Sequence, residues 1–292
     1  MNRTSSEIAT QPDTWTEVAR RAPSLAASLP AHGETLAVIG CGTSLYMAQA
    51  IAGLRETAGL GTTDAFAGSE FAPTRPLDEV LAISRSGTTT EIVRALDALP
   101  PTLPSTIISA VDGTPAVLAA GRSVILEHAD EKSVVQTRFA TTALALMRAH
   151  LGQDLTGAIR DARIAVDEAL PVDPAAFDRF VFLGRGWTVG LANEAALKMR
   201  EAALATTESY PAMEYRHGPI SVAGPATLVW HLGEADDALV RDIEAVGATV
   251  VVRGLDPMAE LILIQRMAVS LAESKGLDPD HPRNLTRSVV LP

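Results

Sequence analysis

Two short turns rich in hydroxyl groups each stand between an apolar run and a helical pattern. The first, GCGTSL at 40–45, follows the apolar run 36–39 and contains Cys41, Gly42, Thr43 and Ser44. The second, SRSGTTT at 84–90, follows the apolar run 80–83 and contains Ser84, Arg85, Ser86 and Thr89. A helix needs one capping hydroxyl, whereas the second turn offers five. Backbone N–H groups and hydroxyls at helix N-termini bind anions, so we interpret the two turns as a phosphate site rather than as coincidental caps.

Neither turn matches the better-known nucleotide motifs. The first departs from the dinucleotide fingerprint G-x-G-x-x-G because Leu45 stands where the third glycine belongs. Neither turn has the Gly-Lys-Ser/Thr ending of a Walker loop or the G-x-S-x-G of a nucleophile elbow. Cys41 is either an activated thiol at a helix mouth or a small packed residue, and no partner base can be assigned to it. The expected ligand is therefore a phosphate monoester, not NAD or a nucleoside triphosphate.

Ionisable groups for proton transfer come from the second half of the chain. The stretch NEAALKMREA places Glu194, Lys198 and Glu201 on one face of a predicted helix, at intervals of four and three residues. The alternative is a solvated stripe of ion pairs, but this helix follows a strand and a Gly-x-Gly turn, so part of its face should look toward a ligand. His217, in EYRHGP, lies in a segment predicted to be a loop, where functional residues concentrate. No two histidines have the spacing of metal ligands, so no metal site is predicted.

Composition narrows the class of protein. With 292 residues the chain has room for one large or two moderate domains, and two is the better expectation. The 35 acidic against 24 basic residues give a net charge of −11, which disfavours binding to nucleic acids or anionic membranes. A single cysteine fits a reducing compartment, and the sequence shows neither a signal core nor a run of the ~18 apolar residues that span a bilayer. We therefore expect a cytoplasmic protein with no membrane contact.

Strand and helix patterns alternate along the chain. Strands are predicted at 36–39, 80–83, 105–111, 123–127, 226–232 and 248–253. Helices are predicted at 43–57, 90–99, 134–151, 236–245 and 258–275. The stretch 180–202 is predicted to form a strand, a Gly-x-Gly turn and a helix. This alternation indicates α/β folding with parallel sheets, and the return of the strand, Gly turn and helix pattern near Phe180 indicates a duplication. We therefore predict an N-terminal arm with a short helix over 1–27, followed by two domains, 28–160 and 161–292, each a parallel sheet with helices on both faces.

Five motifs in order resemble a known family. They are CGTS, SRSGTTTE, GRG followed by NEAALKMRE, EYRHGP and HPRNLTRSV. They resemble the isomerase half of glucosamine-6-phosphate synthase and its stand-alone relatives, which are built from two tandem sugar isomerase (SIS) domains. The similarity runs over nearly the whole chain. It implies two SIS domains, of which the first binds the phosphosugar, and a homodimer with shared active sites. No metal or organic cofactor is expected.

The resemblance also implies roles for individual residues. Those implied to hold the substrate phosphate are Thr43, Ser84, Ser86 and Thr89. Those implied to line the sugar are Ser44, Arg85, Val134 and Gln136, with Cys41 and Gly42 in the same turn and Arg287 near the end of the chain. Glu201 is implied to be the base that moves a proton between C1 and C2, with Lys198 nearby, and His217 assists ring opening across a dimer interface. Aldose–ketose interconversion does need one carboxylate that takes and returns a carbon-bound proton.

Three departures from the synthase pattern affect what is expected. The resemblance does not extend to a glutaminase domain, so no glutamine-dependent amide transfer is expected from within this chain. Arg287 stands where the family has the lysine that forms an imine, and a guanidinium stays protonated and cannot attack a carbonyl. Arg85 replaces a glutamine of the synthase, and Gln136 replaces a serine. These departures suggest another substrate.

The expected function is that of a phosphosugar isomerase or deaminase acting on an amino-sugar or fructosamine-type hexose 6-phosphate. Its proton transfers would be carried out by Glu201 and His217. The alternative is a non-catalytic phosphosugar-binding regulatory protein. The presence of both Glu201 and His217 favours the enzyme, because a pure binder needs no base.

Overall fold

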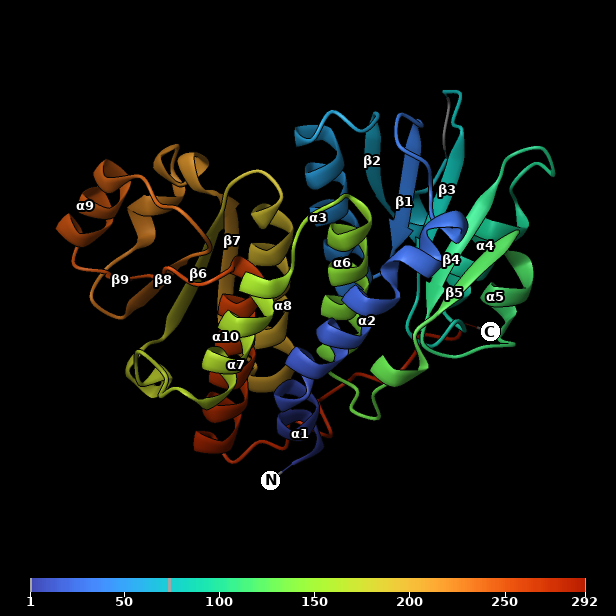
Figure 1. The fold of residues 1–292 in the computed structure, drawn as a ribbon. Coiled ribbons are helices and arrows are strands. Elements are labelled where there is room, and N and C mark those ends of the chain that lie inside the picture. Colours follow the sequence, from blue (N-terminus) through green and yellow to red (C-terminus); the bar gives the residue numbers. More distant parts are fainter. Residues whose placement is uncertain (1, 73–74, 292) are drawn as a thin grey trace. The chain divides into compact units, whose positions relative to one another are not determined.

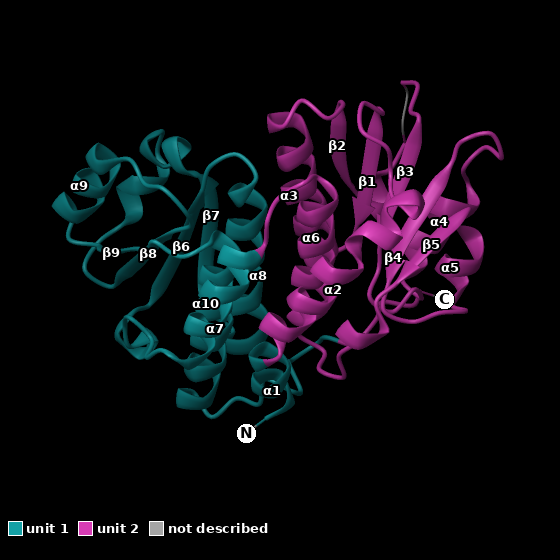
Figure 2. Cartoon of the chain, viewed as in Figure 1, with its two compact units in different colours: residues 1–9, 156–285 teal, residues 10–155, 286–292 magenta. Residues whose placement is uncertain are grey.

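The structure is a computed structural model that describes residues 2–72 and 75–291 (Figure 1). Contacts divide the chain into two compact units, which Figure 2 shows in different colours. We call residues 10–155 with 286–292 the N-unit, and residues 1–9 with 156–285 the C-unit. No helix in the described part of the chain has the length and apolar character that a membrane crossing requires.

The N-unit contains a five-stranded parallel sheet in the order β2-β1-β3-β4-β5. Its strands are β1 (Leu36–Gly40), β2 (Thr63–Ala67), β3 (Glu79–Ile83), β4 (Ser105–Ser109) and β5 (Arg122–Ile125). Its helices are α2 (Gln11–Leu25), α3 (Thr43–Thr57), α4 (Thr90–Asp97), α5 (Pro115–Ala119) and α6 (Arg138–His150). The three central strands are buried at every position, which is why the sequence shows them as continuous apolar runs.

Helices cover both faces of this sheet (Figure 1). On one face, Ile92 and Leu96 of α4 and Val117 of α5 pack against Ile39 and Ala82 of the sheet. Toward the other face, α3 contacts β1 and β2, and α6 packs against α2 and α3. The sheet is therefore the middle layer of the unit. The turns that lead from the strands into the helices lie at the edge formed by the carboxyl ends of the strands.

The C-unit contains a four-stranded parallel sheet in the order β7-β6-β8-β9. Its strands are β6 (Arg179–Gly184), β7 (Thr206–Pro211), β8 (Thr227–His231) and β9 (Thr249–Val252). Its helices are α1 (Arg3–Ala9), α7 (Thr156–Asp167), α8 (Thr188–Ala203), α9 (Asp237–Ala245) and α10 (Pro257–Ser274). Helix α8 lies on β6 and β7 and contacts α10, while α9 packs through Leu239 and Ile243 on the core that contains Val181. Two parallel sheets flanked by helices confirm the predicted α/β class.

In both sheets a strand is followed by a tight turn in which the glycine at the strand end contacts the first turn of the next helix. A Cβ added at Gly40 would lie 2.4 Å from the backbone carbon of Ser44, and one added at Gly184 would lie 2.3 Å from the backbone oxygen of Thr188. No larger residue fits at either position, so each helix can begin directly against its strand end. The two glycine turns seen in the sequence thus have the same structural role.

The amino-terminal residues differ from the predicted polar arm because they form two packed helices. Asp280 caps α1 within the C-unit by accepting bonds from the backbone N–H groups of Arg3 and Thr4, at 2.8 and 2.9 Å. In α2, Trp15 is 1% exposed and donates its indole N–H to Thr141 Oγ1 at 3.0 Å. Burial of an indole contributes much to the stability of the fold. The residues next to Trp15 are polar, so the sequence shows no apolar run that would predict this burial.

Domain borders drawn from the sequence also differ from the contact-based division. The expected border between 160 and 161 falls inside α7, which packs against α10 and lies wholly in the C-unit. Residues 286–292 lie in the N-unit, although they close the chain. The edge strands β2 and β7 are not predicted from the sequence, because TDAFA and TTESYP are half-exposed and lack an apolar run.

A carboxyl group is buried at the start of α10. Glu260 is 0% exposed, and its Oε2 accepts a hydrogen bond from the indole N–H of Trp230 at 3.0 Å. Burial raises the pKa of Glu260 to about 8, although the bond from Trp230 acts in the opposite direction. The carboxyl is therefore mostly protonated at neutral pH in the folded chain.

We expect Glu260→Gln to flatten the pH dependence of the free energy of unfolding. The folded-state pKa of about 8 lies above the reference value of 4.5, so the folded state alone holds this proton between those pH values. The free energy of unfolding of the wild type should therefore fall as the pH rises through this window. Proton linkage gives a total fall on the order of several kcal/mol. Glutamine keeps an acceptor for Trp230 and cannot ionise. Urea unfolding of both proteins from about pH 5 to about pH 9 measures the difference, and parallel curves would contradict this assignment.

Candidate active site

The two hydroxyl-rich turns leave neighbouring strands at the same edge of the N-unit sheet. Strands β1 and β3 pair in parallel, with Ile39 opposite Ala82, so the turns that follow them lie next to each other. Thr43 and Ser44 are the first residues of α3, and Thr89 is the N-cap residue of α4. The side chains that are 3–7% exposed here are those of Thr43, Ser44, Ser84 and Ser86. The predicted proximity of the two turns is confirmed.

The hydroxyls of these turns do not serve as helix caps. Neither α3 nor α4 has a side-chain hydrogen bond at its N-cap. Ser84 Oγ and Ser86 Oγ instead accept bonds from the backbone N–H groups of Gly87 and Thr88, each at 3.2 Å. Because Ser84 Oγ already accepts, its O–H group remains available to donate, which is the polarity that an anion requires. The O–H group of Ser86 donates to Ser288 Oγ at 3.0 Å and would turn to reach an anion. Coincidental capping therefore does not account for the hydroxyl cluster.

The first turn is held in shape by its glycines and by Cys41. Gly42 has a φ of +53°, a left-handed conformation that favours glycine. Cys41 is half-buried beside Gly68, where an added Cβ would lie 3.1 Å from its Sγ. Burial raises the pKa of the Cys41 thiol. A thiol that stays protonated is a poor nucleophile, so these surroundings favour the packed-residue interpretation of Cys41.

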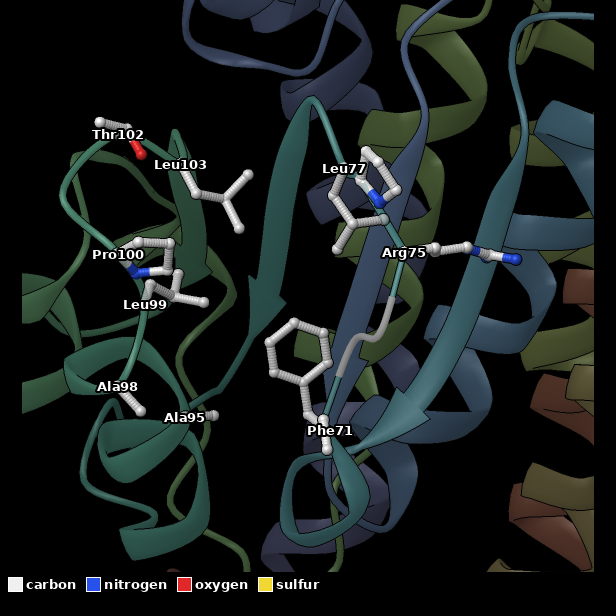
Figure 3. A pocket seen from close by; sticks show the side chains of 11 residues that line it. Phe71, Arg75, Leu77, Ala95, Ala98, Leu99, Pro100, Thr102 and Leu103 are labelled. Carbon is white, nitrogen blue, oxygen red and sulfur yellow. The ribbon is translucent and has the colours of Figure 1, made fainter.

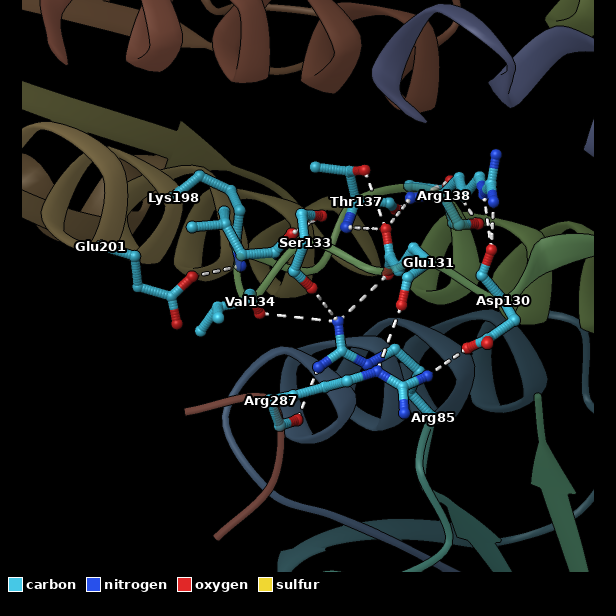
Figure 4. A network of polar contacts seen from close by, with 12 residues as sticks. Arg85, Asp130, Glu131, Ser133, Val134, Thr137, Arg138, Lys198, Glu201 and Arg287 are labelled. Atoms are coloured by element: carbon cyan, nitrogen blue, oxygen red, sulfur yellow. Dashed lines mark hydrogen bonds and ion pairs between the residues drawn. The ribbon is translucent and has the colours of Figure 1, made fainter. Parts of the chain in front are cut away.

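Arg85 is buried in a network of N-unit groups (Figure 4). Its guanidinium donates to the carbonyl oxygens of Ser133 at 2.8 Å and of Arg287 at 2.5 Å. One guanidinium nitrogen lies 3.8 Å from the carboxylate of Glu131, which is itself 0% exposed. The structure thus surrounds Arg85 with groups of the chain, and its expected contact with the sugar stays a prediction.

Glu131 joins this network to the start of α6. Its Oε2 accepts bonds from the backbone N–H groups of Thr137 and Arg138 at 2.9 and 3.1 Å, and from Thr137 Oγ1 at 3.0 Å. A carboxylate at this place stabilises a helix N-terminus. The helix start predicted at residue 134 is therefore wrong, because α6 begins only at Arg138.

Val134 and Gln136 lie in the segment before α6. The carbonyl oxygen of Val134 lies 3.5 Å from a guanidinium nitrogen of Arg85. Gln136 is half-buried, and its buried Oε1 has no hydrogen-bond partner among the described residues. A buried acceptor without a partner is costly, and a hydroxyl of a bound sugar would satisfy it.

Arg287 is engaged by carboxylate and carbonyl groups of the same unit. Its Nη2 donates to Oδ1 of Asp130 at 2.5 Å, and its Nε donates to the carbonyl oxygen of Glu131 at 3.2 Å (Figure 4). These contacts tie Arg287 to the segment before α6. Its expected place near the sugar stays a prediction.

In the C-unit, Lys198 lies between two carboxylates of α8. Its Nζ donates to Oε2 of Glu201 at 2.5 Å (Figure 4). The same nitrogen lies 3.4 Å from Oε1 of Glu194. The side chains of Lys198 and Glu194 are each 1% exposed, whereas that of Glu201 is 18% exposed. Of the three groups, Glu201 is the one that a solute can reach. The predicted shared face of the helix is confirmed, but it is largely buried and is not a solvated stripe.

His217 belongs to the segment that follows β7, whereas Glu194, Lys198 and Glu201 belong to α8. It follows the short 3-10 helix Ala212–Arg216, is exposed, and donates its backbone N–H to the carbonyl of Glu214 at 2.9 Å. Its placement outside regular helix agrees with the predicted loop. A catalytic part for His217 across a dimer interface stays a prediction.

A histidine that has no role in the sequence-based prediction shares a cavity with Glu201. This cavity, of about 150 Å³, is also lined by Asp278, His281 and Arg283. Nδ1 of His281 lies 2.7 Å from Oδ2 of Asp278, and this hydrogen bond lowers the pKa of the Asp278 carboxyl. The i,i+3 spacing of the pair is visible in the sequence, but nothing there links it to a residue some 80 positions earlier.

Another cavity, of about 540 Å³, lies in the N-unit and has a different character (Figure 3). It lies near the amino ends of β3 and β4, where Leu77 and Leu103 line it, rather than at the carboxyl edge with the hydroxyl turns. Its other described lining side chains include Phe71 and Leu99, and among the described lining residues only Arg75 and Thr102 are polar. It offers neither the hydroxyl cluster nor the carboxylates of the candidate site.

Comparison with known proteins finds similarity to proteins named for sugar phosphates. No family model matches it. The glutamine–fructose-6-phosphate aminotransferase (isomerizing) of Gloeobacter violaceus is 28% identical over 91% of this chain, which corresponds to 53% of that protein. The chain thus spans about half the length of this relative.

Solved structures with the same fold extend over nearly all of the chain. The glucosamine-6-phosphate deaminase of Thermotoga maritima has a TM-score of 0.83 at 23% identity, covering 99% of this chain and 100% of that one. The tagatose-6-phosphate ketose/aldose isomerase of Escherichia coli has a TM-score of 0.79 at 18% identity, covering 100% of this chain and 96% of that one. The homologues of this chain are therefore the isomerase (SIS) regions of glutamine–fructose-6-phosphate aminotransferases, and its fold is that of phosphosugar isomerases and a glucosamine-6-phosphate deaminase.

Proposed function

We propose that this chain is a phosphosugar isomerase or deaminase whose substrate is an amino-sugar or fructosamine-type hexose 6-phosphate. The observation that carries the proposal is the pair of hydroxyl-rich turns at the ends of β1 and β3, which are adjacent and do not cap their helices. Homology to the aminotransferases supports it, since their name refers to a hexose 6-phosphate. The deaminase and the isomerase of the same fold also have a hexose 6-phosphate in their names.

The phosphate would be held by O–H and backbone N–H donors of the two turns. Thr43, Ser84, Ser86 and Thr89 supply the hydroxyls, and α3 and α4 begin at the same edge of the sheet, so the positive ends of both helices face the phosphate. These short-range donors act on the ester directly, so the net charge of −11 does not prevent binding of a small dianion. Ser44, Val134 and Gln136 would then contact the sugar.

Proton transfer would be carried out by Glu201. In aldose–ketose exchange, its carboxylate takes the proton from C2 or C1 of the open-chain sugar and returns it to the other carbon. Its contact with Lys198 uses Oε2, and its side chain is accessible. For a substrate with nitrogen at C2, the same shift gives an imine that water hydrolyses to the ketose and ammonia. Lys198 orients the carboxylate in either case.

We also propose how the active protein is assembled. It would be a cytoplasmic homodimer in which His217 acts across the interface to assist ring opening. Two tandem SIS domains, near 28–160 and 161–292, would divide the work between phosphate binding and acid–base chemistry. Neither step uses a metal or an organic cofactor in this proposal.

The reaction can be tested with a panel of hexose and hexosamine 6-phosphates. Each compound is incubated with the protein in D2O, while NMR follows solvent deuterium at C1 and C2 and a separate assay follows ammonia. We expect exchange or isomerisation with at least one compound, and ammonia as a product if that compound is a hexosamine. Binding of a panel member, seen as a thermal shift, without exchange or product would contradict the enzyme and support a binding protein.

A further inference from the structure

The end of the chain contributes a hydroxyl to the second hydroxyl-rich turn. Ser288 Oγ lies 3.0 Å from Ser86 Oγ and 2.9 Å from Thr88 Oγ1. Ser86 Oγ and Thr88 Oγ1 are themselves 3.0 Å apart. The three oxygens therefore form a triangle in which every side is a hydrogen bond.

Backbone bonds on both sides hold Ser288 at this place. On one side, Arg85 donates to the carbonyl oxygen of Arg287 at 2.5 Å. On the other, Thr90 donates its backbone N–H to the carbonyl of Val289 at 3.2 Å, and its Oγ1 accepts from the backbone N–H of Leu291 at 2.8 Å. Ser288 is half-buried, while its neighbours in 286–291 are exposed.

Apolar burial does not explain why the tail lies here. Val289, Val290 and Leu291 are 52%, 68% and 44% exposed, so the tail turns its apolar side chains outward and its serine inward. Hydrogen bonds between neutral hydroxyls contribute little net stability, whereas bonds to an ionised group are roughly twice as strong. Each hydroxyl has one proton to donate, and an anion with several oxygens can accept all three. The three hydroxyls are thus better suited to binding an anion than to fixing the tail alone.

We propose that Ser288, which the tail 286–291 brings to the second hydroxyl-rich turn, is a direct ligand of the substrate phosphate. This inference rests on the proposed function, because it assumes that Ser86 and its neighbours bind a phosphate monoester. Ser288 Oγ accepts from the hydroxyls of Ser86 and Thr88, so on binding its own O–H group donates to a phosphate oxygen. Phosphate binding therefore strengthens the docking of the tail, and no covalent step is involved.

Isothermal titration with glucosamine 6-phosphate, and with inorganic phosphate as a second probe, tests the inference on the full chain. We expect Ser288→Ala to weaken binding of either probe by ~10-fold or more, as expected for loss of a bond to a charged group. Val290→Ala is the matched control, since it changes an exposed side chain of the same tail and should leave the affinity unchanged. Circular dichroism confirms that each variant is folded.

Ser86→Ala separates failure of this inference from failure of the proposed function. If Ser86→Ala weakens binding and Ser288→Ala does not, the phosphate site stands and the role of Ser288 is overturned. Tighter binding by Ser288→Ala would also overturn it, because the tail would then obstruct the site. If the wild type binds neither probe, or if Ser86→Ala leaves binding unchanged, the phosphate site itself is wrong and the inference falls with it.

Discussion

Glu201→Gln is expected to lower the turnover of the substrate phosphosugar by at least ~10²-fold, which is the contribution that a positioned general base typically makes. An amide cannot take a proton from carbon at neutral pH, so the loss should appear in kcat. The substrate phosphate is bound by other residues, so its Kd should change little. Folding should persist as well, because Lys198 keeps Glu194 at 3.4 Å.

A matched control distinguishes this effect from a general loss of negative charge. Glu244→Gln removes an exposed carboxylate at the end of α9 in the same unit and should leave kcat unchanged. Steady-state kinetics and titration of the three proteins with the phosphosugar measure both quantities. Normal turnover by Glu201→Gln would remove Glu201 from the mechanism, whatever its position beside Lys198.

Glu131→Ala is expected to destabilise the N-unit by about 3–5 kcal/mol, the usual effect of removing one partner of a buried ion pair. The substitution leaves the Arg85 guanidinium, which is 2% exposed, without its carboxylate. It also removes the acceptor for three bonds at the start of α6. For a unit of this size, the midpoint of thermal unfolding should fall by roughly 10 °C.

Asp130→Asn provides the comparison for Glu131→Ala. Asp130 is the adjacent acidic residue, but its ion pair with Arg287 is partly exposed, with side chains 36% and 39% accessible. Exposed pairs contribute roughly 0–1 kcal/mol, so this variant should unfold within a few degrees of the wild type. Calorimetry of both variants measures the difference. Equal midpoints would mean that Glu131 is not the buried support that its contacts indicate.

Elements with a strong local signal were predictable from the sequence. The strands β1, β3 and β8 are buried throughout, and each forms an apolar run that can be recognised without tertiary information. The edge strands β2 and β7 lack such a run, because an edge position leaves many of their side chains half-exposed. The start of α6 was missed for another reason. It is set by Glu131, seven residues before Arg138, and no local propensity reports a bond of that kind.

The candidate site shows the same division between local and distant information. The hydroxyl turns were recognisable because their composition and their place after two apolar runs are both local. The partners of Arg85 were not, since Glu131, Ser133 and Arg287 are brought to it only by the fold. The contact of Ser288 with Ser86 likewise joins residues 202 positions apart. Residue type thus indicated the chemistry, whereas the direction of each side chain required the structure.

A crystal structure of the protein with glucosamine 6-phosphate bound would locate the phosphate group itself. We predict that this group lies between the turns that follow β1 and β3, within hydrogen-bond distance of Thr43, Ser84 and Ser86. A phosphate bound elsewhere on the protein, with these hydroxyls still bonded only to the chain, would contradict it.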